Sequence, residues 1–140
     1  MKILANILHR LLLSYPTVPP ENGGILGGTQ NIITEYYHDN SIQKDIIAEY
    51  SPNTFHLNIK IQDWHKKGIE FYGLIHSHPS FEKTLSLADI DYIMNIMNSI
   101  PFNECFLYFP IVIPHETIIP YIAHKKDSDI KISNDILQII

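Results

Sequence analysis

Two histidines separated by a single residue are the part of this sequence best suited to chemistry. His76 and His78 stand at the end of an apolar stretch, and Pro79 follows them. Successive side chains of a β-strand point to opposite faces, so both imidazoles would face the same way, with Cα atoms about 6.6 Å apart. At that separation both rings can reach one zinc ion at Zn–N distances near ~2.0–2.1 Å. Because proline ends the strand, the pair would lie where a site can open to solvent.

An acidic residue follows at the start of the next expected helix. Asp89 falls in the first turn after Ser86, where the helix dipole favours an ionised carboxylate. With the two histidines it makes three protein ligands, the number typical of a catalytic zinc site that keeps a fourth position for water. The metal would lower the pKa of that water from ~15.7 toward ~7. The spacing Ser86-x-x-Asp89 is also that of a capping box, so helix capping is the competing interpretation.

A metal-activated water also needs a proton acceptor that does not bind the metal. Glu21 is the candidate, because it follows two prolines and precedes Gly23-Gly24, at the expected start of a strand. Periodicity alone does not place it beside the histidines, and a solvated loop acid is the alternative. The His-x-His pair taken by itself is more often a pair of surface or packed histidines than a metal site. It is the combination of these residues within a short stretch that favours a metal site.

The elements that must position these residues follow from the spacing of apolar side chains. An amphipathic helix is expected over residues 1–15, and a helix capped by Ser86 is expected to continue to about Ile100. Residues 54–67 fit either a strand or a helix, and the stop signal Lys66-Lys67-Gly68 favours the helix. Strands are expected over 21–28, 32–37, 69–76, 104–113 and 117–124, with a short one near Ile46, and residues 127–140 read as a weak strand or helix. This order of elements predicts an α+β or α/β sandwich.

Composition narrows the class of protein. The 140 residues predict a single domain over 1–140, and 45% hydrophobic with 18% charged residues predicts a folded core. A net charge of −5 argues against nucleic-acid binding and against a membrane-surface protein. The single cysteine excludes an intrachain disulfide and a multi-cysteine zinc site, and it fits a reducing cytoplasm. The helical spacing of residues 1–15 argues against a signal peptide, and no later segment has the ~20 uncharged residues of a membrane span.

Taken together, these residues resemble the signature of the JAMM (MPN+, JAB-type) metalloprotease family. That signature is an upstream glutamate, then H-[ST]-H-P, about six residues, and S-x-x-D. This chain has Glu21, His76-Ser77-His78-Pro79, Ser86 and Asp89 at matching spacing. Residues 21–27 also resemble the E-x-G-G-[IVL]-L-x-G run of prokaryotic members, and the resemblance extends from the first helix to about Ala123.

The resemblance implies an α/β JAMM (cytidine-deaminase-like) fold, in which helices flank a curved mixed β-sheet. It implies one Zn²⁺ per chain, held by His76, His78 and Asp89. Glu21 would take a proton from zinc-bound water and pass it to the leaving amine. Ser86 would donate a hydrogen bond to the developing oxyanion.

The activity implied is that of a zinc-dependent peptidase or isopeptidase resembling deubiquitinases. Its partner would be a ubiquitin-like protein or its conjugate, and the bond cleaved would be the peptide or isopeptide bond that follows the C-terminal residue of that protein. The implied setting is a bacterial ubiquitin-like conjugation pathway of antiphage defence. Trimming of a sulfur-carrier protein, a non-catalytic MPN-type scaffold and a two-metal phosphoesterase are the alternatives. The short loop between Pro79 and Ser86 and the lack of cysteine ligands indicate a compact prokaryotic version without a second zinc. The apolar runs 106–114 and 118–122 leave a homodimer contact open.

Overall fold

The computed structural model describes residues 1–17, 21–39, 52 and 54–140. Its helices are α1 (Ala5–Ser14), α2 (Thr54–Lys66) and α3 (Leu87–Ser99). Its strands are β1 (Lys2–Ile3), β2 (Gly23–Thr29), β3 (Ile32–His38), β4 (Glu70–Ser77), β5 (Glu104–Tyr108), β6 (Ile111–Ile113), β7 (Thr117–Ile119), β8 (Tyr121–Lys126), β9 (Asp129–Asn134) and β10 (Gln138–Ile139). The short strand expected near Ile46 and the extended stretch at Pro19-Pro20 lie outside the described residues.

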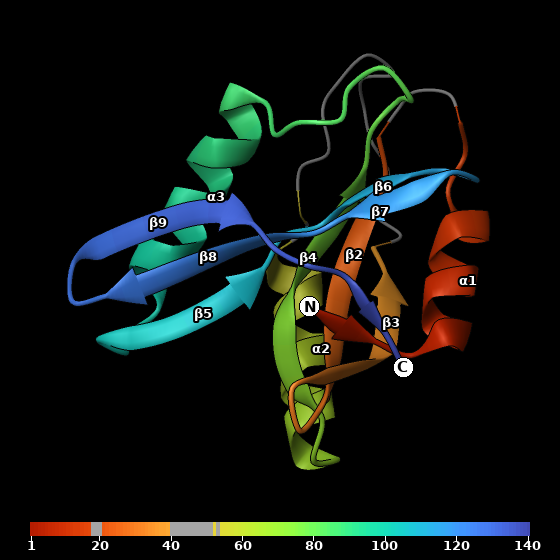
Figure 1. Cartoon of the computed structure of the whole chain (residues 1–140). Helices are drawn as coiled ribbons and strands as arrows, with labels where there is room; N and C mark the ends of the chain where they lie inside the picture. The colour runs from red at the N-terminus through yellow and green to blue at the C-terminus, as the bar shows by residue number, and fades with distance from the viewer. Residues whose placement is uncertain (18–20, 40–51, 53) are drawn as a thin grey trace.

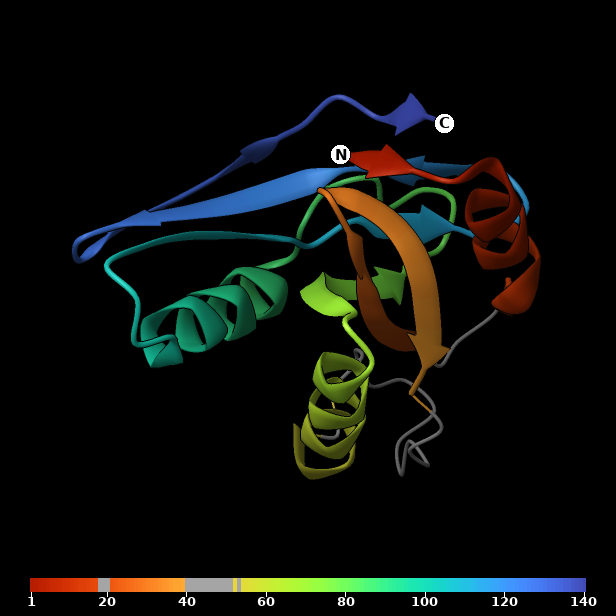
Figure 2. The same cartoon turned by 90° about the horizontal axis from the view of Figure 1, so that it is seen from below.

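The strands form one mixed, curved sheet, as Figures 1 and 2 show. Their order in the described residues is β10-β1-β3-β2-β4-β5-β8-β9, and β6 continues beside β4 beyond β5 and pairs with β7. β4 is parallel to β5 and β6, whereas β2 runs antiparallel to both β3 and β4. The α/β class with a curved mixed sheet flanked by helices is therefore confirmed.

The helices cover opposite faces of the sheet because neighbouring strand residues alternate between two cores. Leu26 and Ile75 pack in the cluster that contains the buried face of α1. Ile25 and Leu74, one position earlier on the same strands, pack in the cluster that contains α2 and α3. Both faces of the central strands are thus buried, which explains why β2 and β4 are apolar without a polar alternation.

Two glycines allow β2 to approach β3 closely. A Cβ atom on Gly28 would lie 1.9 Å from the carbonyl oxygen of Ile32, and one on Gly24 would lie 2.2 Å from that of Tyr37. Both distances are far inside van der Waals contact, so only glycine fits these positions on β2. β2 can therefore lie flush against β3, and the residues just before β2 are carried to the end of β4.

Three expectations from the sequence need correction at the boundaries. The first helix begins at Ala5 and not at Met1, because Lys2–Ile3 pairs with both β3 and β10. The strand expected over 104–113 is divided at Pro110, and that over 117–124 is divided at Pro120. Proline has no N–H for the ladder, so each strand stops there, and the chain resumes in a strand with a different antiparallel partner.

The C-terminal residues, left between strand and helix by their weak periodicity, form strands. β9 follows β8 through a turn at Asp127, which has a positive φ of 56°, and the two strands form a long hairpin. β10 pairs in parallel with β1 at the other end of the sheet. None of the helices among the described residues is long and apolar enough to cross a lipid bilayer.

Candidate metal centre

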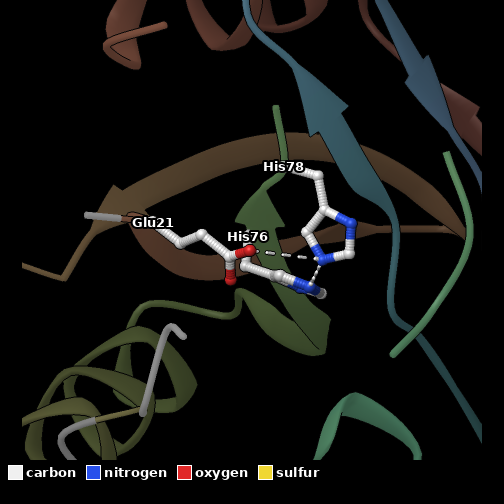
Figure 3. A group of neighbouring side chains, drawn as sticks. All are labelled: Glu21, His76 and His78. Carbon is white, nitrogen blue, oxygen red and sulfur yellow. Dashed lines mark hydrogen bonds and ion pairs between the residues drawn. The ribbon is translucent and has the colours of Figure 1, made fainter. Parts of the chain in front are cut away.

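His76 and His78 project from the end of β4 toward one another. His76 is held in the sheet between Gly23 of β2 and Ile111 of β6, and the N–H of His78 donates to the carbonyl of Val112. Both side chains are buried, and their Nε2 atoms lie 2.8 Å apart (Figure 3). The alternation of the strand and its stop at Pro79 thus bring the rings together. That they bind a metal ion stays a prediction.

The hydrogen-bond partner of Nδ1 determines which nitrogen of the His78 ring carries the hydrogen. Nδ1 of His78 lies 2.9 Å from the carbonyl oxygen of Glu82, and a carbonyl oxygen can only accept. Nδ1 therefore carries the hydrogen, and Nε2 of the neutral ring keeps its lone pair. A backbone acceptor behind a histidine in this way is typical of metal-binding imidazoles.

Asp89 lies beneath both imidazoles. Its Oδ1 is 3.1 Å from Nε2 of His76 and its Oδ2 is 3.1 Å from Nε2 of His78, and the side chain is buried. Burial by itself would raise the pKa of the Asp89 carboxyl, but hydrogen bonds with the two imidazoles hold it well below its usual value. A buried, ionised carboxylate therefore faces the two rings.

The same carboxylate also caps helix α3. The N–H of Ser86 donates to Oδ2 of Asp89 at 2.9 Å, and the N–H of Asp89 donates to Oγ of Ser86 at 3.1 Å. This reciprocal pair is the capping box that the sequence offered as the competing interpretation. Capping and contact with the histidines are both present, because the carboxylate has two oxygens and more than one lone pair on each.

Glu21, two positions before the start of β2, has its side chain at the same centre. Its neighbour Asn22 is tied to β4, because the N–H of Ser77 donates to the Asn22 carbonyl at 2.7 Å and the N–H of Asn22 donates to Oγ of Ser77 at 2.9 Å. Glu21 Oε1 lies 3.8 Å from Nε2 of His78, and the Glu21 side chain is 14% exposed to solvent. Periodicity did not place this residue, and the structure brings it to the rim of the histidine pair (Figure 3).

The donor atoms of this cluster suit a divalent cation. Glu21, His76 and His78 each offer a ligand atom within 4.8 Å of the others, and the Asp89 carboxylate lies against both rings. Burial disfavours the charged form of His78, but the hydrogen bond with Asp89 and the charge of Glu21 raise the pKa of its imidazole. The two carboxylates thus favour a positive charge at this point, either a proton on an imidazole or a bound cation. Imidazole nitrogen and carboxylate oxygen are both ligands that zinc accepts.

Two features of the site escaped the sequence interpretation. The hydroxyl of Tyr92 lies 3.1 Å from Nδ1 of His76, on the side of the ring opposite Asp89. Tyr92 is three positions after Asp89, so helical spacing could have placed it on the same face. The contact of Glu82 with His78 uses the backbone, and no residue type at that position could have signalled it.

No protein-family model and no curated protein matches this sequence. Solved structures do match its fold. The solution structure of a protein from Desulfitobacterium hafniense has a TM-score of 0.63 at 17% identity, over 100% of this chain and 94% of that one. The crystal structure of a JAB1/MPN domain protein from Archaeoglobus fulgidus has a TM-score of 0.56 at 15% identity, over 100% and 99% of the two chains. A protein from Salinibacter ruber has a TM-score of 0.59 at 15% identity, over 100% and 92%. The chain therefore has an MPN-like fold.

Proposed function

We propose that this protein is a zinc-dependent hydrolase of peptide or isopeptide bonds. The observation that carries the proposal is that two buried imidazoles and two carboxylates, from three separate parts of the chain, meet at one point of an MPN-like fold. Burying several ionisable groups together costs folding free energy, and such clusters occur preferentially at functional sites.

In this proposal His76, His78 and Asp89 hold the metal, and Glu21 does not. Asp89 lies 3.1 Å from a nitrogen of each ring, is buried, and is fixed by its capping hydrogen bonds. Glu21 is further from the nearest nitrogen, at 3.8 Å, and it is the more exposed of the two acids. A zinc ion held by these three residues would supply Lewis acidity and lower the pKa of a water toward ~7.

Glu21 is then the group that moves the proton. Its carboxylate stands at the rim, where it can receive a proton at Oε1 from the attacking water and later deliver it to the leaving amine. The link between Asn22 and Ser77 fixes the backbone beside it, so the carboxylate is held within reach of the histidines.

Ser86 is proposed as the donor to the carbonyl oxygen of the substrate. Its Oγ accepts a hydrogen bond from the N–H of Asp89, which leaves the hydroxyl hydrogen to donate. A preorganised donor aimed at a developing oxyanion typically contributes about 10²–10³-fold to turnover. The helix that presents Asp89 to the rings thus also presents this hydroxyl.

The proposed substrate is the C-terminal tail of a ubiquitin-like protein, joined to a further chain or to a lysine side chain. The support for it is the resemblance of the motif that contains Glu21, His76, His78, Ser86 and Asp89 to that of JAMM proteases.

The surface beside the centre also suits a polypeptide. Phe81, in the segment after His78, and Leu87, the first residue of α3, are 81% and 82% exposed. Glu82, next to Phe81, contacts His78, and Ser86, next to Leu87, contacts Asp89, so the chain segments that carry both apolar residues border the centre. Apolar side chains of this kind suit a polypeptide better than a small phosphate ester.

The test compares two isosteric variants of acids near the centre. Glu21→Gln should bind zinc as the wild type does and lose roughly 10²–10⁴-fold in turnover, because the proton acceptor is gone. Glu82→Gln changes an exposed carboxylate whose backbone alone contacts His78, so it should keep both zinc and turnover. Fusions of ubiquitin-like proteins to a fluorescent protein serve as substrates, with and without a chelator.

Three outcomes would count against the proposal. Wild-type protein that takes up no zinc would remove its basis. Cleavage of the fusions by Glu21→Gln at the wild-type rate would show that another group accepts the proton. Cleavage that persists in the presence of chelator would show that the reaction does not use the metal.

A further inference from the structure

The hydroxyl of Tyr92 lies behind the His76 imidazole, on the side away from the candidate metal centre. We propose that Tyr92 is a positioning residue that holds His76 with Nε2 available to the metal. The inference rests on the proposed metal centre, and it concerns metal binding before any substrate is involved.

Helix α3 holds the His76 ring at both nitrogens. Oδ1 of Asp89 lies 3.1 Å from Nε2, and the Tyr92 hydroxyl lies 3.1 Å from Nδ1. Asp89 and Tyr92 are three positions apart on one helix, so they share a face that turns toward the end of β4. The position of the ring is therefore set by α3 as well as by the strand that carries it.

The Tyr92 ring is itself fixed by aromatic packing. It meets the His76 ring edge to face, with centroids 5.9 Å apart and an interplanar angle of 79°. On its other side it packs edge to face on Phe109, at 6.2 Å and 66°, and Phe109 is fully buried. A ring held between two neighbours keeps its hydroxyl at a fixed point, which is what orienting a ligand requires.

The protonation chemistry of imidazole determines which of His76 Nδ1 and the Tyr92 hydroxyl donates the hydrogen bond. A neutral ring has one N–H, so Nε2 can bind a metal only when Nδ1 carries the hydrogen. Nδ1–H of His76 would then donate to the Tyr92 oxygen, just as Nδ1–H of His78 donates to the Glu82 carbonyl. Each histidine thus has an acceptor behind it, one from the backbone and one from a side chain.

The oxygen of the Tyr92 hydroxyl carries lone pairs, so it can accept a hydrogen bond from the ring N–H that faces it.

The test uses Tyr92→Phe, which keeps the packed ring and removes only the hydroxyl. Partners that orient a metal-binding histidine typically account for about 10–100-fold in metal affinity, and a loss of that size is expected in a zinc competition titration. The matched control is Tyr72→Phe, because Tyr72 is a buried tyrosine whose hydroxyl accepts a hydrogen bond from the N–H of Asn31 at 2.9 Å, away from the centre. That variant should bind zinc with wild-type affinity.

A second measurement begins with the wild-type protein, whose result does not depend on how the variant folds. Nitrogen-15 NMR of zinc-loaded protein should show His76 protonated at Nδ1, with that hydrogen protected from exchange with water. In Tyr92→Phe the same hydrogen should lose its protection, which a purely structural role of the tyrosine would not cause.

Three results would overturn the inference. They are unchanged zinc affinity in Tyr92→Phe, an equal loss in Tyr72→Phe, or a His76 ring without hydrogen on Nδ1 in the loaded protein. If the wild type binds zinc and the inference holds but none of the fusions is cleaved, the proposed activity fails and the role of Tyr92 stands. If the wild type binds no zinc, both fail together.

Discussion

The carboxylate of Asp89 both caps a helix and contacts the two candidate metal-binding histidines. It accepts from the backbone N–H of Ser86 at the start of α3, and it lies against an imidazole nitrogen of both His76 and His78. From the sequence, capping and metal binding were rival interpretations of the same residue. They are compatible because a carboxylate offers four lone pairs, more than a single N–H can use.

Asp89→Asn tests this residue directly. The amide oxygen can still accept from Ser86, so the helix start should persist, whereas the negative charge facing the histidines is lost. Zinc affinity should fall by at least ~100-fold, since partners that merely orient a ligand already contribute about 10–100-fold. Zinc per chain after gel filtration measures the loss. If Asp89→Asn kept its zinc and Glu21→Gln lost it, Glu21 and not Asp89 would be the metal ligand, which would contradict the proposed roles.

Zinc binding should also depend on pH through His78. The pKa of its imidazole is raised, so the ring takes up a proton at a higher pH than an ordinary histidine with a pKa near ~6.5. A proton on Nε2 removes the lone pair that binds the metal. Affinity should therefore be constant well above this raised pKa and fall as the pH drops through it. Competition titrations over a series of pH values check this, and constant affinity down to strongly acid pH would contradict it.

At the level of single residues, the sequence pointed to the residues of the cluster but did not fix their geometry. The alternation of a strand was enough to place His76 and His78 on one face. Glu21 lies more than fifty residues earlier, and only the pairing of β2 with β4 brings it to the same point. Local patterns carry no information on such a pairing, and the resemblance to a known motif supplied it instead.

At the level of elements, the N-terminus of α3 is where structure and proposed catalysis meet. Ser86 provides the N-cap hydroxyl and is also the proposed donor to the substrate oxyanion. Ser86→Ala should lower the free energy of unfolding by about 1 kcal/mol, whereas glycine at an N-cap loses only a few tenths of a kcal/mol. Both substitutions remove the hydroxyl, so both should reduce turnover by roughly 10²–10³-fold.

The glycine variant separates the two effects. Chemical denaturation gives the stability of Ser86→Ala and Ser86→Gly, and cleavage of the fusions gives their turnover. If turnover followed stability, with Ser86→Gly close to the wild type, the hydroxyl would serve the helix alone.

Element boundaries show where sequence reasoning succeeds and where it stops. The stop signal after Lys66 correctly favoured a helix over residues 54–67, and Ser86 does begin a helix. The divisions at Pro110 and Pro120 could have been anticipated, because proline cannot continue a central ladder. The strand Lys2–Ile3 could not, because it exists only through its pairing with β3 and β10.

At the level of the whole molecule, the candidate metal centre lies at the end of β4, a central strand of a sheet whose two faces are covered. The cluster under α1 and the cluster under α2 and α3 consist of buried apolar side chains. The backbone of β4 is paired with β2 on one side and with β6 on the other. The fold should therefore not depend on the metal, unlike small zinc domains that unfold without it.

Removal of the metal tests this expectation. Treatment with a chelator should leave the far-ultraviolet circular dichroism unchanged and lower the melting temperature only as far as the loss of a bound ligand requires. A dialysed sample to which zinc is returned should recover the original melting temperature. Unfolding on chelation would show that the two cores alone do not hold the sheet together.

The fold class could be predicted from the order of elements together with the motif, while the pairing at the β10 edge of the sheet could not. The pairing of β10 with β1 joins residues at opposite ends of the chain, and no local pattern reports on a contact of that separation. The single domain, the homodimer contact and the ubiquitin-like partner stay predictions.

The first turns of α3 carry Asp89 and Tyr92, which both contact His76, and the N-cap Ser86, which contacts Asp89. The directions in which these three side chains point are therefore linked by the geometry of one helix. An added residue inside an α-helix rotates everything after it by about 100°. An insertion between Asp89 and Tyr92 would swing the phenol away from His76 while the acid kept its place, whereas an insertion before Ser86 would leave all three in register. Natural length variation should accordingly be tolerated upstream of the helix and excluded from its first two turns.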